Sequence, residues 1–149
     1  MALVKTTIEI DAPRQRVWEL VMDPDRLGDW VTIHRRLHAV SDRPLHEGST
    51  MEQTLRMHGV SFRVNWSLVH VSAPQQAEWE GRGPAHSRAR IGYRLSGGDG
   101  RPTVFQYTNE FTTPGGRLGA MASRVFVGGA SEREAQHSLA RLKAMLESG

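Results

Sequence analysis

Hydrophobic and polar residues alternate along most of the chain. In the segment Leu3–Ile10, Ile8 and Ile10 share one face while Lys5 and Glu9 occupy the other. A period of two is typical of a β-strand that is buried on one side. Six further segments show the same pattern, namely Arg36–Ser41, Ser49–His58, Val60–Val71, Gln76–Glu80, Ser87–Leu95 and Thr103–Phe111. The sequence therefore predicts seven strands of an antiparallel sheet with one face exposed to water.

Two short helices are predicted between the first and second strands. Pro13 suits the first turn of a helix, because its missing N–H has no partner there, and Val17 and Leu20 follow on one helical face. The pair Asp23-Pro24 ends this helix and can begin another, with Asp23 as its N-cap. Gly28 is the expected end of the second helix.

A long C-terminal helix is predicted after Pro114. Its apolar residues follow helical spacing in two groups, which Gly128-Gly129 separates. These residues are Leu118, Met121, Ala122, Val125, Ala135, Leu139, Leu142 and Leu146. Ser131 and Glu134 form a capping-box pattern that could restart the helix, so we expect it to be continuous or mildly kinked. It is the one segment long enough to cover the apolar face of the sheet.

The order of these elements resembles the START-like superfamily, which includes the polyketide cyclase/dehydrase and lipid-transport group. Three stretches carry the resemblance: IEIDAPRQRVWELVMDPDRLGDW (Ile8–Trp30), AEWEG (Ala77–Gly81) and HSLARLKAMLE (His137–Glu147). The resemblance implies an α+β helix-grip fold, in which a bent seven-stranded antiparallel sheet wraps around the C-terminal helix. It also implies a hydrophobic small-molecule cavity between sheet and helix. Such folds host carriers, receptors, cyclases and chaperone cofactors, so no catalytic motif is implied.

The alternation indicates which side chains would face that cavity. Most are apolar or aromatic, and a few are polar groups that could orient a ligand. The expected ligand-binding residues are Trp30, Met51, Gln53, Leu55, Phe62, Val64, Trp66, Trp79, Ile91, Tyr93, Phe105, Tyr107, Asn109, Met121 and Val125. Ordinary core packing is the alternative for each aromatic residue. Buried Gln53, Tyr107 and Asn109 need partners from each other, water or a ligand, or each costs roughly 1–3 kcal/mol.

No motif indicates a metal, a cofactor or a nucleophile. The chain has no cysteine, and its serines lack the nucleophile-elbow pattern. The stretch Gly97–Gly100 joins two strands, whereas a phosphate-binding loop precedes a helix. His34 and His38 are spaced i, i+4 but lie between a short helix and a strand, so we expect surface loop residues and not metal ligands. We therefore expect no cofactor and no metal, and the catalytic residues are left unassigned.

Two acidic residues could be taken for catalytic groups. Asp29 lies beside Trp30 at the expected cavity mouth, but capping or solvating its loop is the simpler role. Glu110 lies on the outer face by strand parity.

The stretch Gly81–Pro84 is predicted to be a turn.

Composition narrows the class of protein and its location. The chain has 149 residues, of which 38% are hydrophobic and 23% charged, as expected for one globular domain over residues 1–149. No apolar run approaches the ~20 residues of a membrane span, and Met1–Ile10 lacks the apolar core of a signal peptide. The absence of cysteine fits a reducing cytoplasm, so we expect a cytoplasmic protein.

Basic residues are nearly all arginine, a bias typical of GC-rich bacterial genomes. They are scattered, apart from Arg35–Arg36 and the row Arg88, Arg90 and Arg94. Nucleic-acid binding needs basic residues clustered with aromatic ones, so we expect no nucleic-acid partner. The arginine row is interpreted as a solvated strand face, with a surface for a dimer or an acidic partner as the alternative.

Three functions fit these observations. The first is a carrier or sensor of a hydrophobic lipid, aromatic or polyketide-like molecule, with Gln53, Tyr93, Tyr107 and Asn109 selecting among ligands. The second is a polyketide cyclase or dehydratase that folds a flexible chain, with Tyr107 or His34 as its acid–base group. The third, an interaction module, is disfavoured because the outward positions are polar. We expect the first, in a monomer or homodimer without an integral membrane segment.

Overall fold

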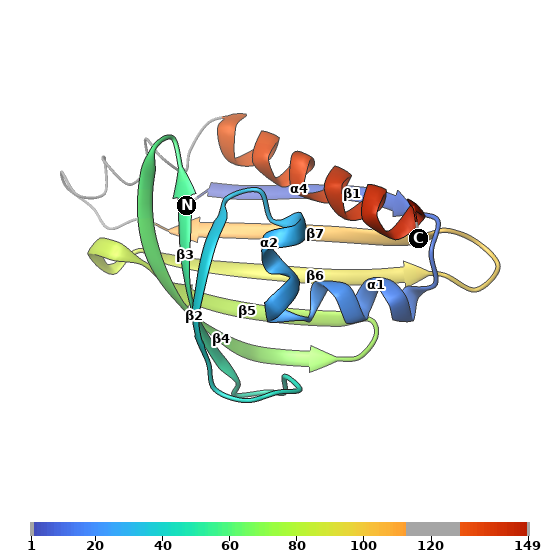
Figure 1. The fold of residues 1–149 in the computed structure, drawn as a ribbon, viewed down its shortest axis with the longest axis horizontal. Coiled ribbons are helices and arrows are strands. Elements are labelled where there is room, and N and C mark those ends of the chain that lie inside the picture. Colours follow the sequence, from blue (N-terminus) through green and yellow to red (C-terminus); the bar gives the residue numbers. More distant parts are fainter. Residues whose placement is uncertain (1, 113–128, 149) are drawn as a thin grey trace.

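The computed structural model describes residues 2–112 and 129–148 (Figure 1). The helices are α1 (Arg14–Val21), η1 (Pro24–Arg26), α2 (Leu27–Trp30), η2 (Pro84–His86) and α4 (Gly129–Ser148). The strands are β1 (Ala2–Ile10), β2 (His34–Val40), β3 (Thr50–Met57), β4 (Val60–Ser72), β5 (Gln76–Arg82), β6 (Arg88–Gly97) and β7 (Thr103–Thr112). This order confirms the predicted α+β helix-grip fold, with short helices between the first two strands.

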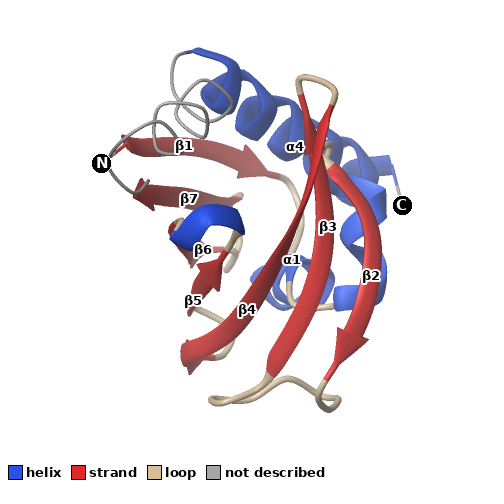
Figure 2. Cartoon of the chain, turned by 90° about the vertical axis from the view of Figure 1, so that its left-hand side faces the viewer, coloured by secondary structure: helices blue, strands red, loops and turns tan. Residues whose placement is uncertain are grey.

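All seven strands form one antiparallel sheet in the order β1-β7-β6-β5-β4-β3-β2. Strands β2 to β7 follow one another as hairpins, while β1 pairs with β7, so that Ile8 lies opposite Phe105. Figure 2 shows the sheet curving from β1 round to β2, with α4 across the opening between them. On each strand, the apolar residues of the alternating pattern face inward. On β4 these include Phe62, Val64 and Trp66.

Helix α4 covers the concave face along β1 and beside α2 (Figure 1). Leu139, Leu142 and Leu146 are buried at helical spacing, as the sequence predicts. Two bonds fix its C-terminal half to the end of β1: the Asp11 N–H donates to Glu147 Oε2 (2.8 Å), and Lys143 Nζ donates to the carbonyl of Glu9 (2.7 Å).

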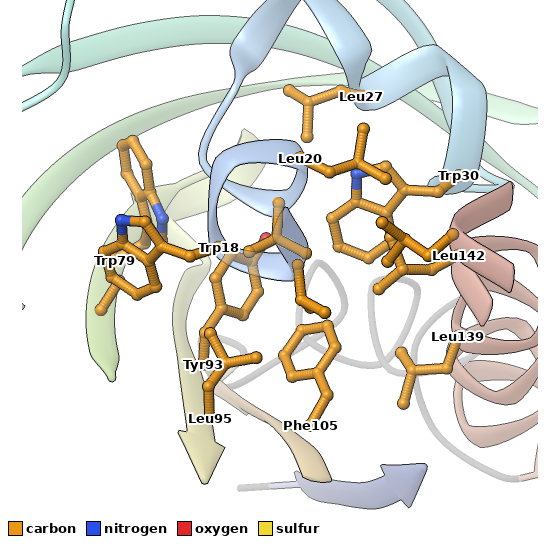
Figure 3. Close-up of a cluster of buried hydrophobic side chains, with 14 of the residues drawn as sticks. Trp18, Leu20, Leu27, Trp30, Trp79, Tyr93, Leu95, Phe105, Leu139 and Leu142 are labelled. Carbon is orange, nitrogen blue, oxygen red and sulfur yellow. The ribbon is translucent and has the colours of Figure 1, made fainter. Parts of the chain in front are cut away.

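The hydrophobic core forms where α1, α2 and α4 meet the inner face of the sheet. Figure 3 shows Trp18 and Leu20 of α1 gathered with Phe105 of β7 and with Leu139 and Leu142 of α4. Phe105 and Leu142 are completely inaccessible to solvent. These core side chains fill one part of the space between the sheet and the helices, and a cavity occupies another part.

Several local predictions need correction. Gly28 lies inside α2, which ends at Trp30, although Asp23 does cap the preceding turn by accepting from the Asp25 N–H (3.0 Å). His34 and His38 belong to β2 and not to a loop. Gly81 is part of β5, which runs on to Arg82 where a turn was predicted.

The C-terminal helix also differs in detail from the prediction. The described helix starts at Gly129, so Ser131 lies within it and is not its N-cap. The first predicted group, Leu118 to Val125, lies outside the described residues. Among the helices that the structure describes, none combines the length and the apolar character needed to cross a membrane.

Candidate functional site

A cavity of about 130 Å³ lies between the concave face of the sheet, α2 and the first half of α4. The predicted binding residues with described positions line this cavity, with one exception. The lining members are Trp30, Met51, Gln53, Leu55, Phe62, Val64, Trp66, Trp79, Ile91, Tyr93, Tyr107 and Asn109. Their polar and apolar mixture is that of a small-molecule pocket.

Phe105 is the exception, because it is not among the residues that line the cavity. Its side chain is completely buried and packs edge-on against Trp30 and Tyr93, with ring centroids 6.3 Å and 5.4 Å away. It therefore supports the cavity wall from behind. Met121 and Val125, also predicted to bind ligand, lie outside the described residues.

Other residues line the cavity without having been predicted to do so. The short helices and the loop after them contribute Val21, Met22, Pro24, Leu27, Val31 and Ile33, and strand ends and loops contribute Val4, Leu45, Met57, Gly83, Pro84, Ser87, Arg88, Ala89 and Phe111. Helix α4 contributes Glu134, Ala135, Ser138 and Leu139. The alternation along β6 places Ala89 inward, so its position in the cavity wall could have been predicted from the sequence. The loop residues follow no periodic pattern from which the same could be predicted.

Gln53 is buried in the wall and is satisfied by protein partners. Its Oε1 accepts a hydrogen bond from Trp66 Nε1 (2.9 Å), and its Nε2 donates to His34 Nδ1 (2.8 Å). Because Trp66 can only donate, it fixes which end of the Gln53 amide faces His34. His34 Nδ1 must then accept, which requires a neutral imidazole with its proton on Nε2.

This hydrogen-bond chain predicts a pH-dependent stability. Burial, and secondly the charge of Arg35, lower the pKa of His34 below its ordinary value. The unfolded chain keeps the ordinary pKa, so it binds the proton more readily and stability falls as pH drops below about 6.5 toward the lower folded pKa.

Replacing His34 with glutamine tests this expectation. Urea denaturation at about pH 7.5 and about pH 5.5 should show a smaller loss of unfolding free energy in His34→Gln than in the wild type. Comparing the two proteins cancels the contribution of other groups, such as His46. Equal losses in both proteins would show that His34 is not responsible.

Tyr93, Tyr107 and Asn109 form a polar strip on β6 and β7. Tyr93 lies opposite Tyr107 in the sheet register, with ring centroids 6.2 Å apart. Burial raises the pKa of both phenols, that of Tyr107 to about 12, although a hydrogen bond with Asn109 opposes the shift. Both hydroxyls are therefore protonated at neutral pH, where Tyr107 can donate a hydrogen bond but cannot act as a base.

Two buried polar atoms of the wall have no hydrogen-bond partner in the part of the chain that the structure describes. They are Oδ1 of Asn109 and Nε1 of Trp30, whose side chain is 1% exposed. Buried polar groups nearly always have a hydrogen-bond partner, so these two unpaired atoms are unusual.

Charged groups reach the cavity only at its margin, within the described residues. Arg88 is exposed, and Glu134 accepts a hydrogen bond from Thr32 Oγ1 (2.5 Å). Thr32 is also bonded to Ser138, because its N–H donates to Ser138 Oγ (3.0 Å). No group of three or more histidine, aspartate or glutamate side chains within residues 2–112 and 129–148 could hold a metal ion.

Known proteins with similar sequence or structure agree with this architecture. The chain is 25% identical over 91 residues to Toxin Rv0910 of Mycobacterium tuberculosis, a match covering 61% of this chain and 63% of that protein's length. A structure from Thermus thermophilus superposes with a TM-score of 0.76 at 16% identity, covering 99% of this chain and 98% of the other. For the solved structure, likeness at 16% identity shows a shared fold alone.

One similar structure comes from a biosynthetic locus. DynU16, described as a putative protein in the dynemicin biosynthetic locus, superposes with a TM-score of 0.66 at 20% identity, covering 99% of this chain and 48% of that one. The sequence model of the family described as "Polyketide cyclase / dehydrase and lipid transport" matches residues 1–147. Family and fold together support a hydrophobic-ligand-binding domain. Because the match spans nearly the whole sequence, this chain belongs to the polyketide cyclase/dehydrase and lipid transport family.

Proposed function

We propose that the protein binds a hydrophobic small molecule in its cavity and carries or senses it. The observation that supports this proposal is the cavity itself, whose wall is mainly aromatic and aliphatic. Transfer of apolar ligand surface from water into such a space contributes roughly 25 cal/mol per Å². The lining residues predicted from the sequence, Gln53 and Tyr93 among them, would contact the ligand.

The size of the cavity favours a compact ligand. Its volume of about 130 Å³ is similar to that of engineered apolar cavities of about 150 Å³ that bind benzene. An aromatic molecule of one or two rings suits this volume better than a whole lipid. A longer polyketide-like or acyl chain would place only one segment inside.

Catalysis as a cyclase or dehydratase is the second candidate and has less support. An acid–base mechanism needs a group that exchanges protons near neutral pH within reach of the substrate. The pKa of Tyr107, about 12, makes it unsuited to act as a base. His34 points its Nδ1 at Gln53 and is not among the described cavity residues. Rearrangement of a supplied poly-β-ketone chain by the purified protein would favour the enzyme.

Filling the cavity should abolish binding. Ala89 is half-buried on β6 and lines the space, so an Ala89→Phe variant places a ring where the ligand would lie. We expect wild-type protein to bind naphthalene saturably in an NMR titration, and Ala89→Phe to lose at least about tenfold in affinity.

The matched control places the same ring outside. Ala39 is exposed on β2, so Ala39→Phe should bind naphthalene as the wild type does. Circular dichroism checks that both variants are folded. Undiminished binding to Ala89→Phe would place the binding site elsewhere. Native mass spectrometry of gently purified wild type would then identify any ligand that it retains.

A further inference from the structure

The polar strip of the cavity carries an unused hydrogen-bond acceptor. Oδ1 of Asn109 is buried and has no partner among the described residues, although Asn109 lines the cavity. An unpaired buried acceptor costs roughly 1–3 kcal/mol. A bound ligand that donates a hydrogen bond would remove this cost.

A donor lies beside this acceptor. The hydroxyl of Tyr107 belongs to the same face of β7, two residues away, and the Asn109 side chain is close enough to oppose the rise in the pKa of this phenol. With Oδ1 unpaired, the amide nitrogen of Asn109 is the group that favours the phenol oxygen, and the O–H of Tyr107 is available to donate. Burial keeps this phenol protonated, since its pKa is raised to about 12. The wall therefore presents an acceptor and a donor next to each other.

The charge of the surroundings selects against an anionic ligand. A carboxylate would place negative charge against the unpaired oxygen of Asn109. The one described cationic residue of the lining, Arg88, is exposed at the margin. A neutral hydroxyl group both donates and accepts, and so it matches Asn109 and Tyr107 without requiring a buried counter-charge.

We propose that the ligand is a neutral hydroxylated aromatic molecule of one or two rings. Its hydroxyl donates to Asn109 Oδ1 and accepts from the O–H of Tyr107, while its ring fills the apolar part of the cavity. This proposal rests on the proposed function and defines its substrate class.

Three naphthalene-based probes test the proposal by NMR or calorimetric titration. We expect 1-naphthol to bind wild-type protein several-fold more tightly than naphthalene, and 1-naphthoate to bind more weakly than 1-naphthol. Asn109→Leu should weaken 1-naphthol binding about tenfold and leave naphthalene within about twofold. Tyr107→Phe, which removes only the hydroxyl, should weaken 1-naphthol several-fold.

A matched control makes the same substitution on the outer face. Asn65 is exposed on β4, so Asn65→Leu should leave the affinity for all three probes unchanged. If Asn109→Leu does not fold, the proposal is still tested by Tyr107→Phe and by the order of affinities of the three probes for the wild type.

The outcomes separate the two proposals. Equal binding of naphthalene and 1-naphthol, tighter binding of 1-naphthoate, or equal losses for both neutral probes in Asn109→Leu would overturn the assignment of a hydroxylated ligand. In each of these cases the cavity would still be a binding site. Failure of the wild type to bind any of the three probes would overturn both proposals.

Discussion

Replacing Phe105 with alanine is expected to lower the free energy of unfolding by about 3–5 kcal/mol, because it empties a fully enclosed aromatic site. The Phe105 side chain is inaccessible to solvent and meets Trp30 and Tyr93 edge-on. Both neighbours are themselves buried side chains, so the gap cannot close completely. For a chain of this length the melting temperature should fall by roughly 10 °C.

Urea denaturation followed by circular dichroism measures this effect. The matched control is Phe111→Ala, which makes the same change on the same strand at a half-buried position. Its loss should be less than half of that for Phe105→Ala. A loss below about 1 kcal/mol for Phe105→Ala would mean that the site collapses freely, contrary to the packing described above.

Gly81→Ala is expected to destabilise the fold by about 1–3 kcal/mol through a steric clash. A Cβ at this position would lie 2.5 Å from Cζ3 of Trp66 and 2.9 Å from Cγ1 of Val64. Trp66 lies directly opposite Gly81 in the β4–β5 register and is buried. The indole must therefore shift, which strains its hydrogen bond to Gln53.

Two measurements separate this clash from a general effect of alanine. The indole N–H resonance of Trp66 should move in Gly81→Ala, since its acceptor geometry changes. Gly28→Ala is the control, because a Cβ there meets only His34, at an ordinary 3.4 Å, and α2 favours alanine over glycine. An unchanged resonance together with an unchanged stability would show that Trp66 has room to move.

Strand parity predicted the fold well, but it could not predict how deeply each inward side chain is buried behind the cavity wall. It identified inward side chains on every strand, and the apolar spacing of the tail identified the covering helix. Parity cannot distinguish a side chain that lines a void from one that packs behind it, and so Phe105 was grouped with Tyr93. That distinction depends on where α1, α2 and α4 touch the sheet, which no single segment encodes.

Local irregularity explains the remaining errors. The β2–β3 register shifts between His34 and Arg36 and again between Leu37 and Ala39, so the alternation of β2 is broken and its start was missed. Gly81 was assigned to a turn because glycine is disfavoured in strands, yet here the bulk of Trp66 on the neighbouring strand requires it. The chain His34–Gln53–Trp66 depends on both features and was therefore not predictable.

The pairing of β1 with β7 has a consequence for biosynthesis. During translation β1 is made first, but its partner strand is completed only after about a hundred further residues. Until then the apolar side of β1, with Ile8 and Ile10, has no sheet to join. The hairpins β2 to β7 can form from neighbouring segments, whereas pairing of β1 with β7 requires closure of the longest loop in the sheet. A nascent chain halted before Thr103 would therefore expose β1 without its partner strand, as a binding site for a ribosome-associated chaperone.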